Sequence, residues 1–165
     1  MLTQVDRPIV SKAAPKPPIG GLKLYGDGAS LADFSRLHAQ GMVMGFTTNP
    51  TLMFKAGIAD YADFARQLIA LIPDMPLSFE VFSDDFAEME RQARLIAAWG
   101  DNVYVKIPIT NTQGQSSLPM ARALAADGVK LNITAMLTLE QVAEAVDILA
   151  DDTPAILSVF AGRIA

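Results

Sequence analysis

Lys106 is the strongest candidate for a catalytic residue in this sequence, because it lies in the middle of an apolar run, VYVKIP, at residues 103–108. Burying a charged ammonium group costs free energy, so an unpaired buried lysine is favoured in its neutral form. A neutral amine attacks a ketone or aldehyde carbonyl and forms a Schiff base. A lysine directed to solvent and a lysine held in a buried ion pair are the alternatives that the sequence leaves open.

Two carboxylates can move the protons that Schiff-base chemistry requires. Glu80 lies in the apolar run LSFEVFS at residues 77–83, and Asp27 lies between two glycines. Dehydration of a carbinolamine and cleavage of a carbon–carbon bond both need proton transfer, and carboxyl groups in different environments can share this work. Asp27 is equally well explained as a turn residue. Glu80 is harder to explain without a function, because acidic residues are rarely buried unless they are paired.

Other polar side chains are suited to a polyhydroxylated, phosphorylated substrate. Asn49 precedes a proline, which favours an extended backbone and a rigid turn that holds its amide group in place. Asn132 and Thr134 are two residues apart, so on a strand they share one face. Ser158 and Arg163 bracket the segment VFAG, and an arginine can bind phosphate through two parallel hydrogen bonds. A plain turn at Asn49 and a surface position for Arg163 remain alternatives.

These polar residues recur at the same position in successive repeats, near the carboxyl end of each apolar run. Their separations are 22, 31, 26, 26 and 26 residues, which matches one strand, one helix and two loops per repeat. In a parallel sheet such residues all lie at the carboxyl end, and in a (β/α)8 barrel they meet at the mouth where barrel enzymes keep their active sites. The six residues are Asp27, Asn49, Glu80, Lys106, Asn132 and Ser158.

The surrounding sequence alternates between short apolar runs and amphipathic stretches. The apolar runs, at residues 22–29, 42–49, 77–83, 103–110, 129–137 and 155–163, have the length of strands. Strict alternation predicts a parallel sheet covered by helices, either as an open doubly wound sheet or as a barrel. The first run is not followed by the G-x-G-x-x-G motif of a dinucleotide-binding sheet.

Helical periodicity separates the strands. Apolar residues every three or four positions predict helices that begin near Leu31, Tyr61, Phe86 and Leu139, and another helix at residues 118–126. Capping-box spacing marks two helix starts, in the segments SLAD at residues 30–33 and TLEQ at residues 138–141. No helix is predicted between Asn49 and Tyr61.

Composition bounds the domain organisation and excludes several functions. The 165 residues, 51% of them hydrophobic, predict one folded domain at residues 22–165 after a flexible Pro-rich tail at residues 1–21. The absence of cysteine and the single histidine exclude disulfides, thiolate nucleophiles and a His-His metal site. A net charge of −5 without a basic patch argues against nucleic-acid binding. No apolar run is long enough to cross a membrane. We therefore expect a cytoplasmic protein that binds neither nucleic acid nor membrane.

Taken together, the segments GFTTNPTL, SFEVFSDD, NVYVKIPIT, VKLNITAML and SVFAGRIA resemble the transaldolase family, specifically its small members related to fructose-6-phosphate aldolase. The resemblance extends from about Leu22 to Ile164. It implies a class I aldolase-like (β/α)8 TIM barrel without metal or organic cofactor. It also implies a transferase that moves a three-carbon dihydroxyacetone unit from a ketose phosphate to an aldose phosphate, as in the pentose phosphate pathway, and a homo-oligomer for a full-length chain.

The same resemblance implies residue roles. Lys106 forms the Schiff base and Asp27 is the acid/base for carbon–carbon cleavage. Glu80, through a water held with Thr134, moves protons during Schiff-base formation. The substrate-binding residues are Asn49 and Asn132 for hydroxyl groups and Ser158 and Arg163 for phosphate, with Phe160 beside them. Fructose-6-phosphate aldolases tend to have Gln at the position of Glu80 and Tyr at that of Phe160, so this chain is more similar to transaldolases.

The length departs from the family pattern. Residues 22–165 hold about 5.5 repeats of about 26 residues, which is room for six strands, whereas the barrel has eight. The sequence therefore predicts an incomplete barrel whose first and sixth strands are unpaired edges, and we expect a fragment or truncated product. Aldol cleavage of fructose 6-phosphate, or an inactive module for sugar-phosphate binding or assembly, are the alternatives to transaldolase activity.

Overall fold

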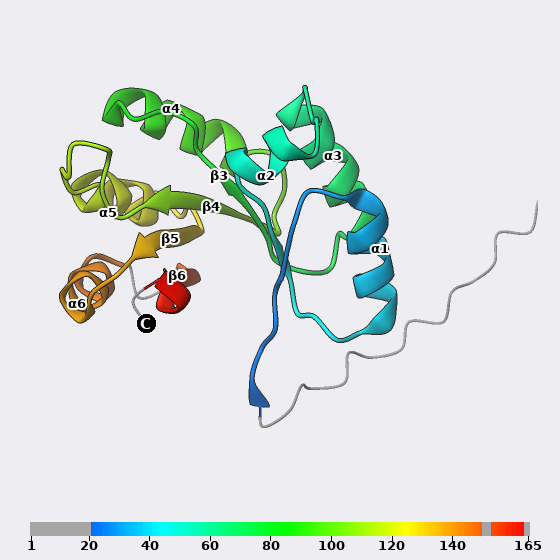
Figure 1. Cartoon of the computed structure of the whole chain (residues 1–165). Coiled ribbons are helices and arrows are strands. Elements are labelled where there is room, and N and C mark those ends of the chain that lie inside the picture. Colours follow the sequence, from blue (N-terminus) through cyan, green and yellow to red (C-terminus); the bar gives the residue numbers. More distant parts are fainter. Residues whose placement is uncertain (1–20, 150–152, 164–165) are drawn as a thin grey trace, which may run out of the picture.

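The part of the chain that the structure describes forms one curled sheet of six parallel strands (Figure 1). The structure, a computed structural model, describes residues 21–149 and 153–163. The strands follow each other in sequence order, β1-β2-β3-β4-β5-β6, and every neighbouring pair is parallel. Their bounds are β1 (Gly26–Asp27), β2 (Phe46–Thr47), β3 (Leu77–Glu80), β4 (Val103–Pro108), β5 (Leu131–Met136) and β6 (Ala155–Val159). This is the order of a (β/α) barrel, and it rules out a doubly wound sheet, in which the strand order reverses.

Helices follow one another around the outside of the curved sheet (Figure 1). They are α1 (Leu31–Gln40), α2 (Pro50–Lys55), α3 (Tyr61–Leu71), α4 (Phe86–Ala97), α5 (Leu118–Ala126) and α6 (Leu139–Ile148), and a short 3-10 helix, η2 (Ala161–Arg163), follows β6. Side-chain oxygens cap several of them as the sequence predicted. Ser30 accepts a hydrogen bond from Asp33 N, and Thr138 and Gln141 form a full capping box.

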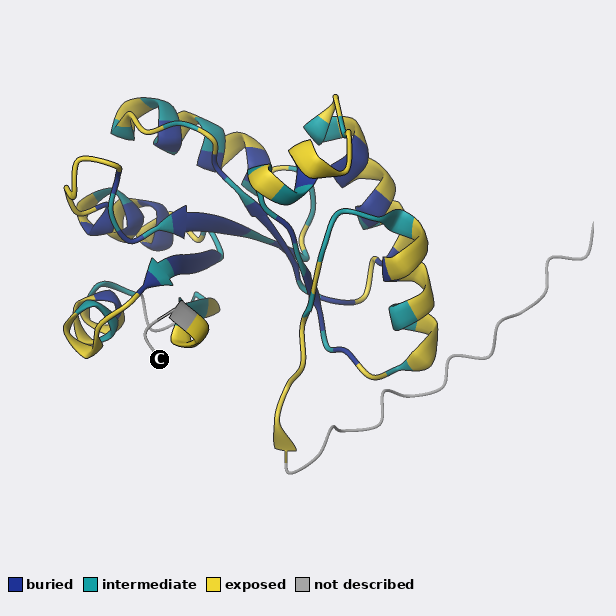
Figure 2. Ribbon diagram, viewed as in Figure 1, coloured by how far each residue is buried: buried dark blue, intermediate teal, exposed yellow. Residues whose placement is uncertain are grey.

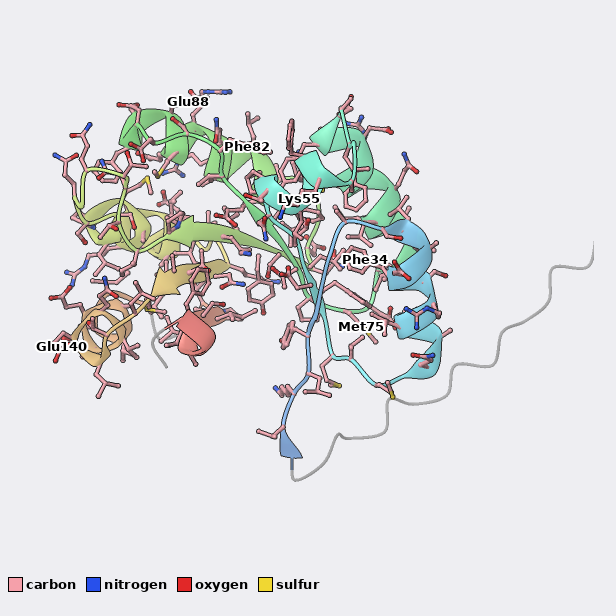
Figure 3. All side chains as sticks on the ribbon, viewed as in Figure 1. Phe34, Lys55, Met75, Phe82, Glu88 and Glu140 are labelled. Atoms are coloured by element: carbon pink, nitrogen blue, oxygen red, sulfur yellow. The ribbon has the colours of Figure 1, made fainter. Side chains whose placement is uncertain are left out.

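The two faces of the sheet differ in chemistry because successive strand residues point to opposite sides. The outer face is formed by odd-numbered residues that belong to the buried core between sheet and helices: Leu77, Phe79, Val103, Val105, Ile107, Leu131 and Ile133. Strands β3 to β5 are accordingly mostly dark blue in Figure 2. Phe34 on α1 faces the sheet in this way and contacts Phe46 with ring centroids 4.8 Å apart (Figure 3). Even-numbered residues of the same strands lie on the inner face and are mostly polar. The apolar core therefore lies between sheet and helices, and the inner face carries the candidate chemistry.

A close backbone approach at the amino-terminal end of the sheet requires glycine. A Cβ atom at Gly45 would lie 2.5 Å from the Tyr25 ring and 2.7 Å from the Pro76 carbonyl oxygen. Tyr25 therefore lies directly over the backbone that leads into β2, and only a residue without a side chain allows this contact.

Helix α2 corrects one expectation, since the sequence predicted only a rigid turn after Asn49. The Asn49 side chain instead caps a helix by accepting a hydrogen bond from Leu52 N at 3.0 Å, and Pro50 occupies the first helical turn. Proline is favoured there because its missing N–H would have no partner in any case. The Asn-Pro dipeptide thus ends β2 and begins α2 in consecutive residues.

The sheet is open at both ends within the described residues. Among residues 21–149 and 153–163, strand β1 pairs only with β2 and β6 pairs only with β5, as the repeat count predicted. Twenty residues of the tail predicted at residues 1–21 fall outside the described ranges. In the part of the chain that the structure describes, no helix combines the length and the apolar character that crossing a membrane requires.

Candidate active site

The Lys106 amine lies on the inner face of β4 and is almost fully buried, with 7% of the residue exposed. Its Nζ atom lies 3.3 Å from Glu80 Oε2 and donates a hydrogen bond to the Thr48 carbonyl oxygen at 3.1 Å. Glu80 and Lys106 are direct partners in the β3–β4 register, which explains why the two side chains meet. Of the alternatives left open by the sequence, solvent exposure is wrong and a buried ion pair is present.

The Glu80 carboxyl group is held in an environment that disfavours its charge. Burial raises the pKa of Glu80 above its usual value, the Lys106 charge opposes this rise, and the negative charge of Asp27 adds to it. The Glu80 carboxyl group lies within reach of the Lys106 amine, so it is placed to exchange a proton with it. The pair therefore combines a potential nucleophile with an adjacent acid/base group.

Asp27 lies at the carboxyl end of β1, on the same side of the sheet. The residue is exposed at the open edge, yet partial burial of its carboxyl group raises its pKa, while the Lys106 charge lowers it. Asp27 therefore acts electrostatically on both members of the buried pair. The two acidic groups and the amine form one coupled set of charges.

A hydrogen-bonded chain of polar side chains on the same face links β3, β5 and β6. Asn132, the β5 partner of Lys106, donates from Nδ2 to Ser78 Oγ at 3.1 Å, and Ser158 Oγ donates to Asn132 Oδ1 at 2.7 Å. Sequence reasoning named Asn132 and Ser158 but missed Ser78. Its position two residues before Glu80, on the same face of β3, was the available signal.

Thr134 contributes a buried hydroxyl group that has no hydrogen-bond partner in the structure. It is 2% exposed and follows Asn132 on the inner face of β5, where a register shift and the positive φ of Ala135 (62°) bend the strand. Buried hydroxyls are nearly always paired, so this one is available to a water molecule or a substrate group. Thr47 and Thr48 at the end of β2 also carry unpaired buried hydroxyls.

The remaining predicted residues lie farther along the carboxyl ends of the strands. The Asn49 oxygen is used by the helix cap, which leaves its amide NH2 as a donor. Phe160 directly follows β6, and its N–H donates to the Met136 carbonyl at 2.8 Å. Arg163 ends η2, and its side chain lies outside what the structure describes. The structure thus brings together Lys106 and Glu80 through direct contact and places the other residues on the same end of the sheet.

The sequence of this chain is similar to those of known proteins. The family model described as Transaldolase/Fructose-6-phosphate aldolase matches residues 24–165. This chain belongs to that family. Three relatives named probable transaldolase or probable transaldolase 2 match 120 residues, 73% of this chain: 38% identical in Dehalococcoides mccartyi, 37% in Hyphomonas neptunium and 34% in Listeria monocytogenes. The matches cover 54%, 53% and 52% of the relatives, so the chain spans about half the length of the curated relatives it matches.

A solved structure shows the same architecture at low sequence identity. The structure described as QR15, an Aldolase, superposes with a TM-score of 0.59 over 87% of this chain and 71% of that chain, at 12% identity. This likeness concerns the fold alone. The sequence prediction of the transaldolase/fructose-6-phosphate aldolase family and of a partial (β/α) barrel is confirmed.

Proposed function

We propose that this chain provides the Schiff-base half of a transaldolase active site, which transfers a dihydroxyacetone unit between sugar phosphates through Lys106. The observation that supports this most strongly is the buried pair of Lys106 and Glu80, 3.3 Å apart, on the inner face of a transaldolase-family sheet. An amine in this position has a proton acceptor within reach and an apolar shell behind it.

Schiff-base formation begins with transfer of the ammonium proton from Lys106 to Glu80. The neutral amine attacks the ketone carbon of the donor ketose phosphate, and the carbonyl oxygen takes a proton from Glu80. Glu80 then removes the extra proton from nitrogen and returns it to the departing hydroxyl group, which leaves as water and gives an iminium ion. A water molecule held by the free Thr134 hydroxyl relays these protons.

Carbon–carbon cleavage uses the second carboxylate. Asp27 accepts the proton of the hydroxyl group on the far carbon of the bond that breaks. That carbon becomes the aldehyde of the aldose product, and the electron pair of the broken carbon–carbon bond moves into the iminium ion to give an enamine. The aldose product leaves. The enamine carbon then attacks the aldehyde of the acceptor, Asp27 returns its proton to the new hydroxyl group, and water hydrolyses the Schiff base. Asp27 lies on β1 at the open edge and takes no part in the Lys106–Glu80 contact, which fits its use in a separate step.

Polar groups at the strand ends hold the substrate. Asn132 is fixed by its hydrogen bonds to Ser78 and Ser158, and Asn49 offers its amide NH2 from the helix cap. Both are suited to sugar hydroxyls. Ser158 and Arg163 bind the phosphate group, as the family resemblance implies.

Reductive trapping tests the proposal. The protein is incubated with fructose 6-phosphate and sodium borohydride, and peptide mass spectrometry locates the adduct. We expect it on the peptide that contains Lys106 and not in Lys106→Met. The exposed lysine on α2 gives a matched control, Lys55→Met, which should still form the Lys106 adduct. A folded wild-type protein without an adduct would refute the proposal.

Product analysis separates the two activities of the family. A transaldolase releases little product from fructose 6-phosphate until an acceptor aldose phosphate is added, whereas an aldolase releases dihydroxyacetone without an acceptor. Glu80 and Phe160, where family aldolases tend to have Gln and Tyr, favour the transferase. Ligand binding that persists in Lys106→Met, with no adduct in either protein, would instead indicate a non-catalytic binding module.

A further inference from the structure

The hydroxyl group of Tyr61 satisfies both backbone polar groups of Glu80. Tyr61 is the first residue of α3, and its Oη atom accepts a hydrogen bond from the Glu80 amide at 2.8 Å and donates one to the Glu80 carbonyl at 3.2 Å. A tyrosine hydroxyl is both donor and acceptor, so this one group can pair with the N–H and the C=O of Glu80 at the same time. Sequence reasoning placed Tyr61 only on the apolar face of a helix.

Strand pairing explains why Glu80 needs such a partner. The amide of Val81 donates to the Lys106 carbonyl on β4, while the carbonyl of Ser78 accepts from Thr48 at the end of β2. Backbone groups alternate in direction along a strand, so those of Glu80, like those of Ser78, point to the β2 side.

Strand β2 does not extend far enough to pair with the backbone N–H and C=O of Glu80. It ends at Thr47, and the chain then turns into α2 through Asn49 and Pro50. Pro50 has no N–H to donate, and the helix that begins there leads away from the sheet. Without Tyr61, the Glu80 amide and carbonyl would be unpaired in a largely buried place, which proteins rarely tolerate.

The ring of Tyr61 is held by three aromatic residues, two of which, Phe79 and Phe82, lie within two residues of Glu80 in the sequence. It makes edge-to-face contacts with Phe79, Phe82 and Trp99, at centroid distances of 6.0, 4.6 and 5.7 Å. Phe82 is the second residue after the end of β3 and is labelled in Figure 3. Three edge-to-face contacts fix the ring, and the fixed ring sets the position of its hydroxyl group.

We propose that Tyr61 is a positioning residue that fixes the end of β3 so that the Glu80 carboxyl group meets Lys106. This rests on the proposed function for its catalytic consequence. Tyr61 does not touch the reacting atoms and acts only through the Glu80 backbone. Burial raises the pKa of Tyr61, so its hydroxyl group keeps its proton and remains a donor across the working pH range.

The charged groups that face Glu80 come from two other strands. Lys106 on β4 forms the ion pair, and Asp27 on β1 adds a negative charge. Any change in the titration of Glu80 must therefore be measured with both of these groups intact. The neutral hydroxyl of Tyr61 is the contact from α3.

The variant Tyr61→Phe tests the proposal because it removes the hydroxyl and keeps the ring. We expect the rate of Schiff-base trapping to fall about 10- to 100-fold, the range that a small displacement of a catalytic group produces. We also expect the titration of the Glu80 side-chain carboxyl, followed by carbon-13 NMR, to move to lower pH as the loosened strand end lets water reach it. Tyr25→Phe, a matched hydroxyl deletion away from Glu80, should change neither quantity.

A second control separates positioning from general packing. Trp99→Phe weakens one of the three aromatic contacts of Tyr61 but leaves the other two and the hydroxyl group, so it should lower stability while moving the Glu80 titration much less than Tyr61→Phe does. An unchanged Glu80 titration in Tyr61→Phe, or an equal shift in Trp99→Phe, would overturn the proposal.

Two readouts keep this test separate from that of the proposed function. If the wild-type protein forms no adduct, the proposed function fails, and the Glu80 titration still decides the role of Tyr61. If Tyr61→Phe does not fold, amide hydrogen exchange in the wild-type protein decides it: the Glu80 amide should be protected like those in the middle of β3. Fast exchange at Glu80 would contradict the hydrogen bond on which the inference rests.

Discussion

Replacing Lys106 with methionine tests whether Lys106 and Glu80 form a coupled buried pair, because the change removes the charge and nearly keeps the side-chain length. At 3.3 Å and an effective dielectric constant of about 20, the attraction between two unit charges is about 5 kcal/mol. Desolvation of the two groups offsets several kcal/mol of this. We therefore expect a net coupling of about 1–3 kcal/mol in the free energy of unfolding.

A double-mutant cycle measures that coupling directly. Urea unfolding followed by circular dichroism is carried out on the wild-type protein, Lys106→Met, Glu80→Gln and the double variant. Each single change leaves one polar group buried without its partner, whereas the double change removes both charges. We expect the double variant to lose less stability than the two single variants combined.

The cost of Lys106→Met should also depend on pH. Burial raises the pKa of Glu80 above its usual value of 4.5, and loss of the Lys106 charge raises it further. A carboxyl group whose folded pKa exceeds its unfolded pKa adds to stability below the unfolded value, and this contribution disappears as pH rises through the folded pKa. The variant should therefore be closest to the wild type near pH 4.5 and fall behind as the pH increases. A coupling below about 0.5 kcal/mol with a pH-independent cost would refute the buried-pair reasoning.

Two further predictions concern the unpaired hydroxyl and the close glycine contact. Thr134→Val removes a buried hydroxyl that has no partner, so stability should stay within about 1 kcal/mol of the wild type, while Schiff-base trapping slows. A large loss of stability would show that the hydroxyl is paired in solution. Gly45→Ala places a Cβ atom 2.5 Å from the Tyr25 ring and 2.7 Å from the Pro76 carbonyl, so the urea midpoint should fall by an amount equivalent to about 1–3 kcal/mol. An unchanged midpoint would show that Tyr25 is free to move away.

The sequence by itself determined the repeating unit of this protein and the side of the sheet that carries polar groups. Apolar periodicity located four of the six α-helices in the described residues, because burial of one helix face leaves a local pattern in the chain, and the alternation of strands and helices located the helix at residues 118–126. The recurrence of one polar residue about every 26 positions placed Lys106, Glu80 and Asn132 at corresponding points of parallel strands, which the register confirms. The family followed from the motifs around these residues.

Tertiary structure alone decided which of these groups touch. The contact of Lys106 with Glu80 and the Thr48 carbonyl, and that of Asn132 with Ser78, depend on strand register and sheet curvature, which are set by pairing between distant segments. The sequence indicated only that Tyr61 lies on the apolar face of a helix. Its hydroxyl pairs with the Glu80 backbone only because β2 ends before the point where it would pair with Glu80 of β3. Where one strand ends relative to its neighbour is decided only in the assembled sheet.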